Sequence, residues 1–245
     1  MPEVRWTRIR EQVAAAFLPK NAFLGWGAII AGNAEGGENM PDQPSWPTED
    51  ELRKLPLGAI VAYAARCARR VQPLYGRTAG AAKLPKHEAA VEWAISLAEN
   101  FCLSHEVSGA AYAAAYDARD AVDAADARDA ARAASAAARA AAYAFDIPRS
   151  AAYEHAVYAN RVAIEAGDAA NAAARAANHA CDGARAVEAA ARADFDRLLQ
   201  LNQGTYPQLG TPIAATENGP LGPLWPGGPP EWFAGGRLAS RTKVP

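Results

Sequence analysis

Nearly half of the residues between Ala110 and Ala193 are alanine, 41 of 84. Alanine has the highest intrinsic helix propensity, yet its side chain buries very little apolar surface. We therefore expect this segment to be helical. It can hold a tertiary structure only where helix backbones approach one another closely, or where larger side chains come from other parts of the chain. Because alanine carries no reactive group, the segment itself indicates no catalytic chemistry.

Composition favours a soluble, cytoplasmic protein of the all-α class. The net charge of −2 provides no general attraction for nucleic acids or anionic membranes. The apolar stretch 22–31 is broken by glycines and is too short to span a bilayer. The charged N-terminal residues lack the hydrophobic region of a signal peptide. Cys67, Cys102 and Cys181 lie far apart in helix-like surroundings, which favours reduced, buried thiols over disulfides.

The first 105 residues carry the bulky side chains of a conventional helical core, and their spacing predicts four amphipathic helices. The four are a helix on which Trp6, Ile9, Val13 and Phe17 share one face, a short helix that follows the capping box Thr48–Glu51 and ends at Pro56, a helix over about 57–71, and a helix over about 85–103. Together with the alanine-rich part they are expected to form one helical domain over residues 1–203.

Two long helices are expected within the alanine-rich segment, forming an antiparallel hairpin over residues 110–201. The first covers about 110–145 and ends before Pro148, and the second covers about 151–201 with Ser150 as its N-cap. Polar residues recur at every third position of the first helix, so their stripe spirals around it. They are Asp117, Asp120, Asp123, Asp126, Asp129, Arg132 and Ser135. Either this repeat is a tolerated low-complexity expansion, or the helix meets different neighbours at different heights.

The second long helix has a regular apolar seam with heptad spacing. The seam consists of Ala163, Ala166, Ala170, Ala173, Ala177, Ala180, Ala184, Val187 and Ala191. A seam of this kind lets helices pack at or below the usual separation of about 8–10 Å. Because such a seam is self-complementary, it predicts self-association about a twofold axis as the simplest interaction.

The last region, residues 204–245, contains eight prolines and eight glycines and cannot be helical. Four prolines recur every third residue, a spacing that polyproline II would place on one ridge, with Leu221 and Leu224 on another. Two interpretations are open. The tail packs in a groove of its own helical body and supplies the bulk that alanine lacks, or it is a proline-rich ligand for an aromatic-lined partner. The partner-binding candidates are Pro220, Pro223, Trp225, Pro226, Trp232 and Phe233.

The motifs of the common catalytic and metal sites are missing from the sequence. None of His87, His105, His155 and His179 has glutamate three residues before it, so the Glu-x-x-His pairs of di-iron bundles are absent. Cys-x-x-Cys, His-Glu-x-x-His, Gly-x-Ser-x-Gly and phosphate-binding loops are absent as well. We therefore assign no catalytic, cofactor-binding or metal-binding residues.

Two charged groups remain to be interpreted. Glu88, Glu92 and Glu99 form an acidic stripe on one predicted helix. The local basic cluster consists of Arg66, Arg69, Arg70, Arg77, Lys83 and Lys86. Arginines beside aromatic residues can contact nucleic acids. We favour instead their pairing with the acidic stripe or with the aspartates of 117–129.

The sequence therefore favours a non-catalytic interaction or scaffold protein, which binds a protein partner or a second copy through its alanine surfaces or its proline-rich tail. The alternative is a helical-bundle enzyme or small-molecule binder with a pocket between the N-terminal helices and the tail. Trp26, Tyr63, Trp93 and Trp225 would line that pocket, with Glu88, Glu92 or His87 as acid–base groups.

Overall fold

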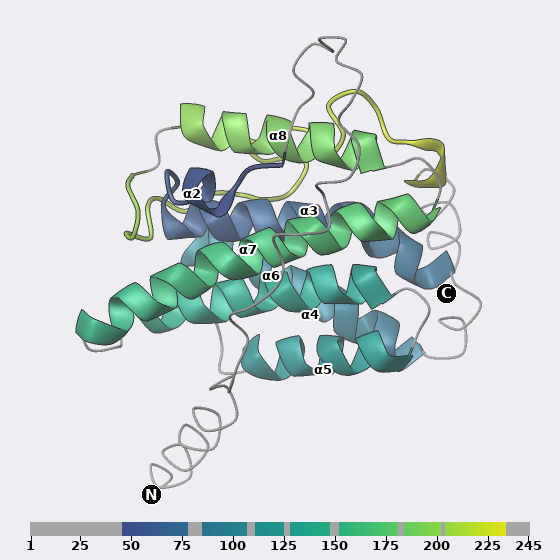
Figure 1. Cartoon of the computed structure of the whole chain (residues 1–245), viewed down its shortest axis with the longest axis horizontal. Coiled ribbons are helices and arrows are strands. Elements are labelled where there is room, and N and C mark those ends of the chain that lie inside the picture. The colour runs from purple at the N-terminus through teal and green to yellow at the C-terminus, as the bar shows by residue number, and fades with distance from the viewer. Residues whose placement is uncertain are drawn as a thin grey trace, which may run out of the picture. The chain divides into compact units, whose positions relative to one another are not determined.

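The computed structural model describes residues 46–77, 85–106, 111–124, 128–147, 152–180, 184–201 and 204–233. All of them belong to one unit, residues 44–245. They form helices and irregular segments with no strand, which confirms the all-α prediction (Figure 1). The N-terminal helix expected from Trp6 to Phe17 lies outside the described residues, as do Trp26, Lys83 and the helix ends expected at Pro148 and Ser150.

Seven helices carry labels in Figure 1. They are α2 (Glu49–Leu52), α3 (Leu57–Arg77), α4 (Pro85–Ser104), α5 (Ala111–Ala124), α6 (Arg128–Asp146), α7 (Ala152–Ala180) and α8 (Ala184–Gln200). The predicted capping box is present at the start of α2. There the Thr48 hydroxyl accepts a hydrogen bond from the Glu51 amide at 3.2 Å, and the Glu51 carboxylate accepts one from the Thr48 amide at 2.9 Å.

The alanine-rich helix α6 packs against four others, α3, α4, α5 and α7. Alanine is the reason it can do so, because a small side chain on every face leaves room for a neighbour on each side. Its buried alanines are Ala130, Ala131, Ala133, Ala134, Ala136, Ala137, Ala138, Ala140, Ala141, Ala142 and Ala144. The alanine repeat thus builds the interior of the described unit and little of its surface.

The expectation of one continuous helix over 110–145 is wrong. The hydroxyl of Ser135 on α6 donates to the backbone oxygen of Ala115 on α5 at 3.0 Å. Twenty residues apart in one helix, these residues would be separated by about 30 Å. The chain forms two helices that pack against each other instead, since a straight helix of that length would leave much of its alanine surface in water.

The polar residues of the three-residue repeat have different surroundings along these two helices. Ser135 is buried against α5. Asp129 accepts hydrogen bonds from Arg132 and from Arg175 on α7, both at 3.1 Å. Asp117 and Asp120 line a groove beside α4. This arrangement supports the interpretation in which the repeat meets different neighbours at different heights.

The second long helix is likewise divided, into α7 and α8, which pack against each other and against α3. All but one of the described members of its seam are buried within the unit, from Ala163 through Ala177 on α7 to Val187 and Ala191 on α8, and Ala184 is partly buried. A surface already covered by the chain's own helices is not free to meet a second copy. The seam therefore stabilises the fold of one chain, and self-association would need another surface.

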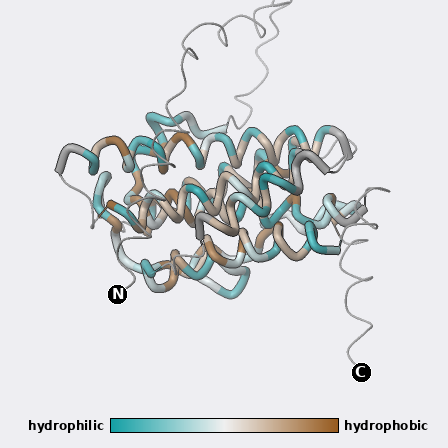
Figure 2. Tube along the Cα trace, turned by 90° about the horizontal axis from the view of Figure 1, so that it is seen from below, coloured by the Kyte–Doolittle hydropathy of each residue, from teal (hydrophilic) through white to brown (hydrophobic). Residues whose placement is uncertain are grey.

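Most bulky core side chains come from outside the alanine helices, as expected from their composition, with Phe195 of α8 an exception. Figure 2 shows brown, strongly hydrophobic positions in short stretches among pale and teal ones. The largest buried apolar side chains include Tyr63, Tyr75, Phe101 and Phe195. The tail adds buried Ile213, Leu221, Leu224, Trp225, Trp232 and Phe233. These residues fill space that alanine cannot fill.

Enlarging an alanine of α6 tests this packing. We expect Ala137→Leu to lower the free energy of unfolding by about 1–3 kcal/mol, because extra methylene groups in a filled interior force the neighbouring helices apart. The matched control is Ala189→Leu on the exposed surface of α8, where alanine and leucine have similar helix propensities. Urea unfolding followed by circular dichroism measures both variants. Equal stabilities would contradict close packing around α6.

Candidate functional site

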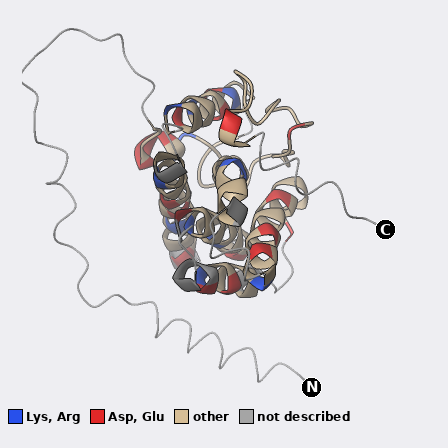
Figure 3. Cartoon of the chain, turned by 90° about the vertical axis from the view of Figure 1, so that its right-hand side faces the viewer, with Lys and Arg blue, Asp and Glu red and all other residues tan. Residues whose placement is uncertain are grey.

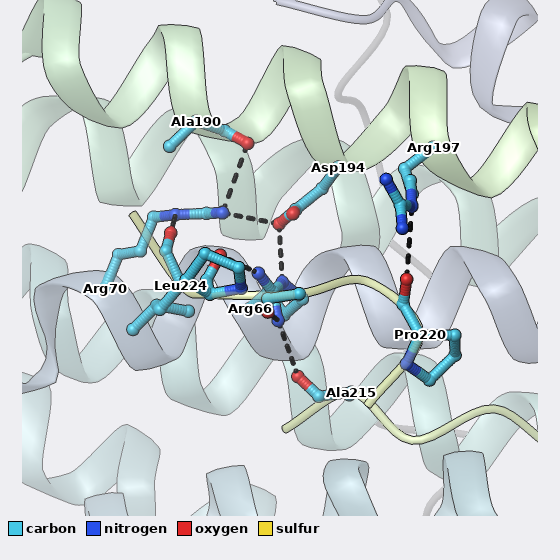
Figure 4. A network of polar contacts seen from close by, with 10 residues as sticks. Arg66, Arg70, Ala190, Asp194, Arg197, Ala215, Pro220 and Leu224 are labelled. Atoms are coloured by element: carbon cyan, nitrogen blue, oxygen red, sulfur yellow. Dashed lines mark hydrogen bonds and ion pairs between the residues drawn. The ribbon is translucent and has the colours of Figure 1, made fainter. Parts of the chain in front are cut away.

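Two arginines of α3 are completely buried at the side of the unit where the tail lies. Arg66 and Arg70 stand one helical turn apart, each with an exposed fraction of 0%. Both bind the same oxygen of Asp194 on α8: Nε of Arg66 lies 2.7 Å from Oδ2, and Nη2 of Arg70 lies 2.5 Å from it (Figure 4). Asp194 is itself 1% exposed. The ion pairs join α3 to α8 out of contact with solvent.

Most of the remaining guanidinium N–H groups bind backbone oxygens, while Nη1 of Arg70 is buried without a hydrogen-bond partner among the described residues. Arg66 donates to three tail carbonyls and Arg70 to one, and Arg70 also donates to α8 (Figure 4). The acceptors are Ala215 and Gly222 at 3.1 Å and Pro223 at 2.8 Å for Arg66, and Leu224 at 3.0 Å and Ala190 at 3.1 Å for Arg70. The two arginines therefore hold the tail by its backbone, whatever its side chains are.

This buried network has more positive than negative charge, with two guanidinium groups to one carboxylate. A buried charge without a partner costs several kcal/mol. Here the excess charge is met by the five carbonyl dipoles, because each oxygen presents its negative end to a guanidinium N–H. On the outer side, Arg197 of α8 donates to the carbonyl of Pro220 at 3.1 Å. The tail is thus bound by α3 and α8 together.

The start of the tail occupies the ends of two helices. The first two amides of α3, Leu57 and Gly58, donate to the carbonyls of Gln208 and Leu209 at 2.8 and 2.9 Å. The amide of Ile213 donates to the carbonyl of Cys102 in the last turn of α4 at 2.7 Å. Helix termini leave such groups without helical partners. The tail therefore acts as a cap for α3 and α4 before it reaches the arginines.

Aromatic side chains complete the attachment of the tail. Trp225, Trp232 and Phe233 are at most 6% exposed and contact one another, with ring centroids 5.3–6.0 Å apart. The guanidinium carbon of Arg70 lies 5.7 Å from the ring centroid of Trp225, within the range of a cation–π interaction. These three partner-binding candidates are therefore buried against their own chain.

Three prolines of the tail lie on the side opposite its buried apolar side chains. Pro220, Pro223 and Pro226 are exposed, while Leu221 and Leu224 between them are buried. The period of three predicted from the sequence is present, but continuous polyproline II is not. Pro220 and Pro226 each occupy the second position of a four-residue turn. In the first turn the Gly222 amide donates to the Gly219 carbonyl, and in the second the Gly228 amide donates to the Trp225 carbonyl, both at 3.0 Å. Both closing glycines have positive φ, 72° and 90°.

Buried thiols lie near the network but cannot act as nucleophiles there. Cys67 and Cys102 are free and buried, as predicted, while the side chain of Cys181 lies outside the described residues. Burial raises the pKa of the Cys67 thiol to about 12, and burial also raises the pKa of Cys102. The reactive form of cysteine is the thiolate. Both groups therefore remain protonated thiols near neutral pH.

Three arginines of the basic cluster, Arg66, Arg69 and Arg70, occupy two kinds of position. Arg66 and Arg70 belong to the buried network, so neither can reach a phosphate. Arg69 binds Glu92 and Glu99 of α4, each at 2.7 Å, as the expected pairing with the acidic stripe requires. Burial lowers the pKa of Arg69, but the hydrogen bonds that Arg69 donates to Glu99 and Glu92 outweigh it and the pKa is raised. Elsewhere, acidic and basic residues are interspersed along the helices (Figure 3).

The residues proposed for an enzyme pocket do not come together. Tyr63 is buried in the core, and Trp225 lies over Arg70. Trp93 and His87 line a separate groove between α4 and α5. Glu92 is held by Arg69, away from these aromatic residues. The described part of the chain therefore has no single cavity formed by these groups.

A second buried ion pair joins α6 to α7. Arg139 lies 2.7 Å from the carboxylate of Glu165, which is 6% exposed, and also donates to Ser135 at 3.0 Å. Burial raises the pKa of Glu165, and the charge and hydrogen bond of Arg139 oppose this rise. Because Glu165 is buried between packed helices and Arg139 is only partly exposed, we interpret the pair as structural.

Within the described residues, no three His, Cys, Asp or Glu side chains lie close enough to hold a metal ion, and no helix is long and apolar enough to cross a membrane. Comparisons with protein-family models, curated proteins and solved structures found no match. The site is therefore interpreted from its own geometry.

The buried network was missed at the sequence level, where Arg66 and Arg70 were grouped with exposed basic residues. A signal was present, because both arginines lie beside the inward positions Cys67 and Val71 of an otherwise apolar helix. Asp194 gave no comparable signal, since its partner is 128 residues away in the chain. Such a pairing depends on the tertiary fold.

Removing the shared carboxylate tests the network. We expect Asp194→Asn to lower the free energy of unfolding by about 3–5 kcal/mol, because it leaves two buried guanidinium groups without a counter-charge. The control is Asp196→Asn on the same helix, which removes a partly exposed pair with Arg192 and should cost less than about 1 kcal/mol. Urea unfolding at constant ionic strength compares them. Similar losses in the two variants would show that the buried pairs contribute no more than a surface pair.

Closing the tail turns requires a residue without a side chain. A Cβ atom at Gly219 would lie 2.2 Å from the carbonyl oxygen of Ala214, whereas one at Gly227 would meet nothing within 4 Å. We expect Gly219→Ala to displace the tail and destabilise the protein by about 1–3 kcal/mol. Gly227→Ala should leave stability nearly unchanged. Thermal unfolding and protease cleavage of the tail measure the effect; equal cleavage of both variants would contradict the observed turn.

Proposed function

We propose that the chain is a non-catalytic, intracellular interaction protein that presents the turns of residues 219–228 to a protein partner. The observation that carries this proposal is the division of the tail into two sides. Its carbonyls and large apolar side chains are bound to the helices, while Pro220, Pro223 and Pro226 are exposed. This division supports a recognition surface with a fixed conformation.

A fixed loop is favourable for binding because its conformational entropy is lost during folding and need not be lost again on association. Loops held by a rigid scaffold are common positions for recognition residues. In this tail, two buried arginines set the backbone at Gly222, Pro223 and Leu224. The arrangement supports presentation of the proline rings in one geometry.

Proline rings are rigid apolar surfaces that aromatic side chains of a partner can contact. Because two of these prolines are in turns, the partner would recognise spaced proline corners and not an extended polyproline helix. The aromatic candidates Trp225, Trp232 and Phe233 then act as anchors within the chain. We therefore assign partner contact to Pro220, Pro223 and Pro226.

The proposal is tested with the full-length chain carrying Pro220→Ala, Pro223→Ala and Pro226→Ala together. A protein captured with the wild-type chain is purified and its affinity is measured by calorimetry. It supports the proposal only if it binds the purified wild-type chain and if its affinity for the triple variant is at least about tenfold lower. Thermal stability should be almost unaffected, because the rings are exposed.

Gly219→Ala provides a second test, because it keeps all three prolines but disturbs the backbone conformation that holds them. It should weaken binding of the same purified partner, and Gly227→Ala should not. Unchanged affinity of the triple variant for every such partner would overturn the assignment to the prolines. Unchanged affinity of Gly219→Ala alone would overturn the role of the fixed conformation.

A further inference from the structure

A groove between α4 and α5 is separate from the tail, and the inference drawn from it does not rest on the proposed interaction surface. The groove has a volume of about 320 Å³. Trp93 forms part of its wall and is 37% exposed. Ala89 and Ala90 provide further apolar lining, and Asp117 and Asp120 of α5 line it as well.

The two aspartates are unlike most carboxylates of the described helices. Glu92 and Glu99 on α4 are bound by Arg69, and Asp129 on α6 by arginines. Asp117 and Asp120 form no hydrogen bond or ion pair with another described residue. They lie three positions apart, so both are on one side of α5, where like charges disfavour each other. A cation between them would remove that repulsion.

The groove therefore combines two carboxylates with an exposed indole and a small aliphatic wall. Carboxylates accept charge-assisted hydrogen bonds from ammonium and guanidinium groups. An indole face attracts the same cations. Alanine side chains leave space for the alkyl chain that carries such a group.

The geometry points to a binding site for an alkyl guanidinium or alkyl ammonium group, held by Asp117 and Asp120 and packed against Trp93. A metal ion is a poorer match, because His87, Asp117 and Asp120 all line the groove, yet no three His, Cys, Asp or Glu side chains of the described residues are placed to hold a metal ion together. The volume is sufficient for one small ligand or one basic side chain.

Lys86 also lines the groove and gives the proposal a distinctive consequence. Its ammonium group repels an incoming cation and competes with it for the aspartates. Removing that charge should strengthen binding, whereas removing either aspartate should weaken it. An effect of opposite sign at two positions is difficult to produce by general loss of structure.

The experiment is calorimetric titration of the full chain with agmatine, a guanidinium on a short alkyl chain. We expect Asp117→Asn with Asp120→Asn to weaken binding about tenfold and Trp93→Leu about fivefold, with Trp93→Phe less affected because it keeps an aromatic face. Lys86→Ala should strengthen binding about threefold. The matched control is Glu88→Gln on exposed α4, which is outside the groove lining and should have little effect.

A second titration distinguishes a free ligand from a protein side chain. A short neutral-capped peptide with one central arginine should bind more tightly than agmatine if the groove takes a side chain, and more weakly if it takes the free molecule. Either order of the two affinities supports a cation-binding site, and the order shows whether its ligand is a free molecule or a protein side chain. Absence of agmatine and peptide binding at millimolar concentration, or equal affinity of the wild type and the double aspartate variant, would overturn it.

Discussion

The close approach of α6 to four neighbouring helices is the constraint on which the rest of the structure depends. The consecutive alanines Ala136, Ala137 and Ala138, whose side chains point to different sides of this helix, are all buried. Larger residues there would separate the helices, as the low tolerance of packed interiors for added volume implies. The same choice leaves little apolar area per residue. Larger side chains from α3, α4 and the tail are therefore needed to complete the core.

The tail fills this need although it has no regular secondary structure, and that creates a second physical problem. Irregular backbone packed on a protein needs partners for its carbonyl groups. Arg66 and Arg70 supply those partners, and Asp194 lowers the cost of burying them. Apolar residues of similar size could stabilise such a contact equally well but could not fix a backbone conformation. This difference is the reason why the network supports the proposed interaction surface.

Some of the fold and part of the candidate site could be predicted from local patterns. The Thr48–Glu51 capping box is a local feature, since its two partners lie three residues apart. The separation of the prolines from Leu221 and Leu224 also followed from spacing. The division into α5 and α6 did not, because alanine favours helix continuously and only packing of α5 on α6 makes two helices preferable. Pairing of Arg66 with Asp194 likewise depends on where α8 lies.

The sequence by itself determined that the chain is helical, that its alanine surfaces pack closely and that residues 204–230 are irregular. These properties follow from propensity, side-chain volume and proline geometry, which act over a few residues. Only the tertiary structure decided which arginines are buried, that the alanine seam is used inside the chain, and that Asp117 and Asp120 share a groove with Trp93. The reason is that burial and ion pairing depend on neighbours distant in sequence, which a local pattern cannot specify.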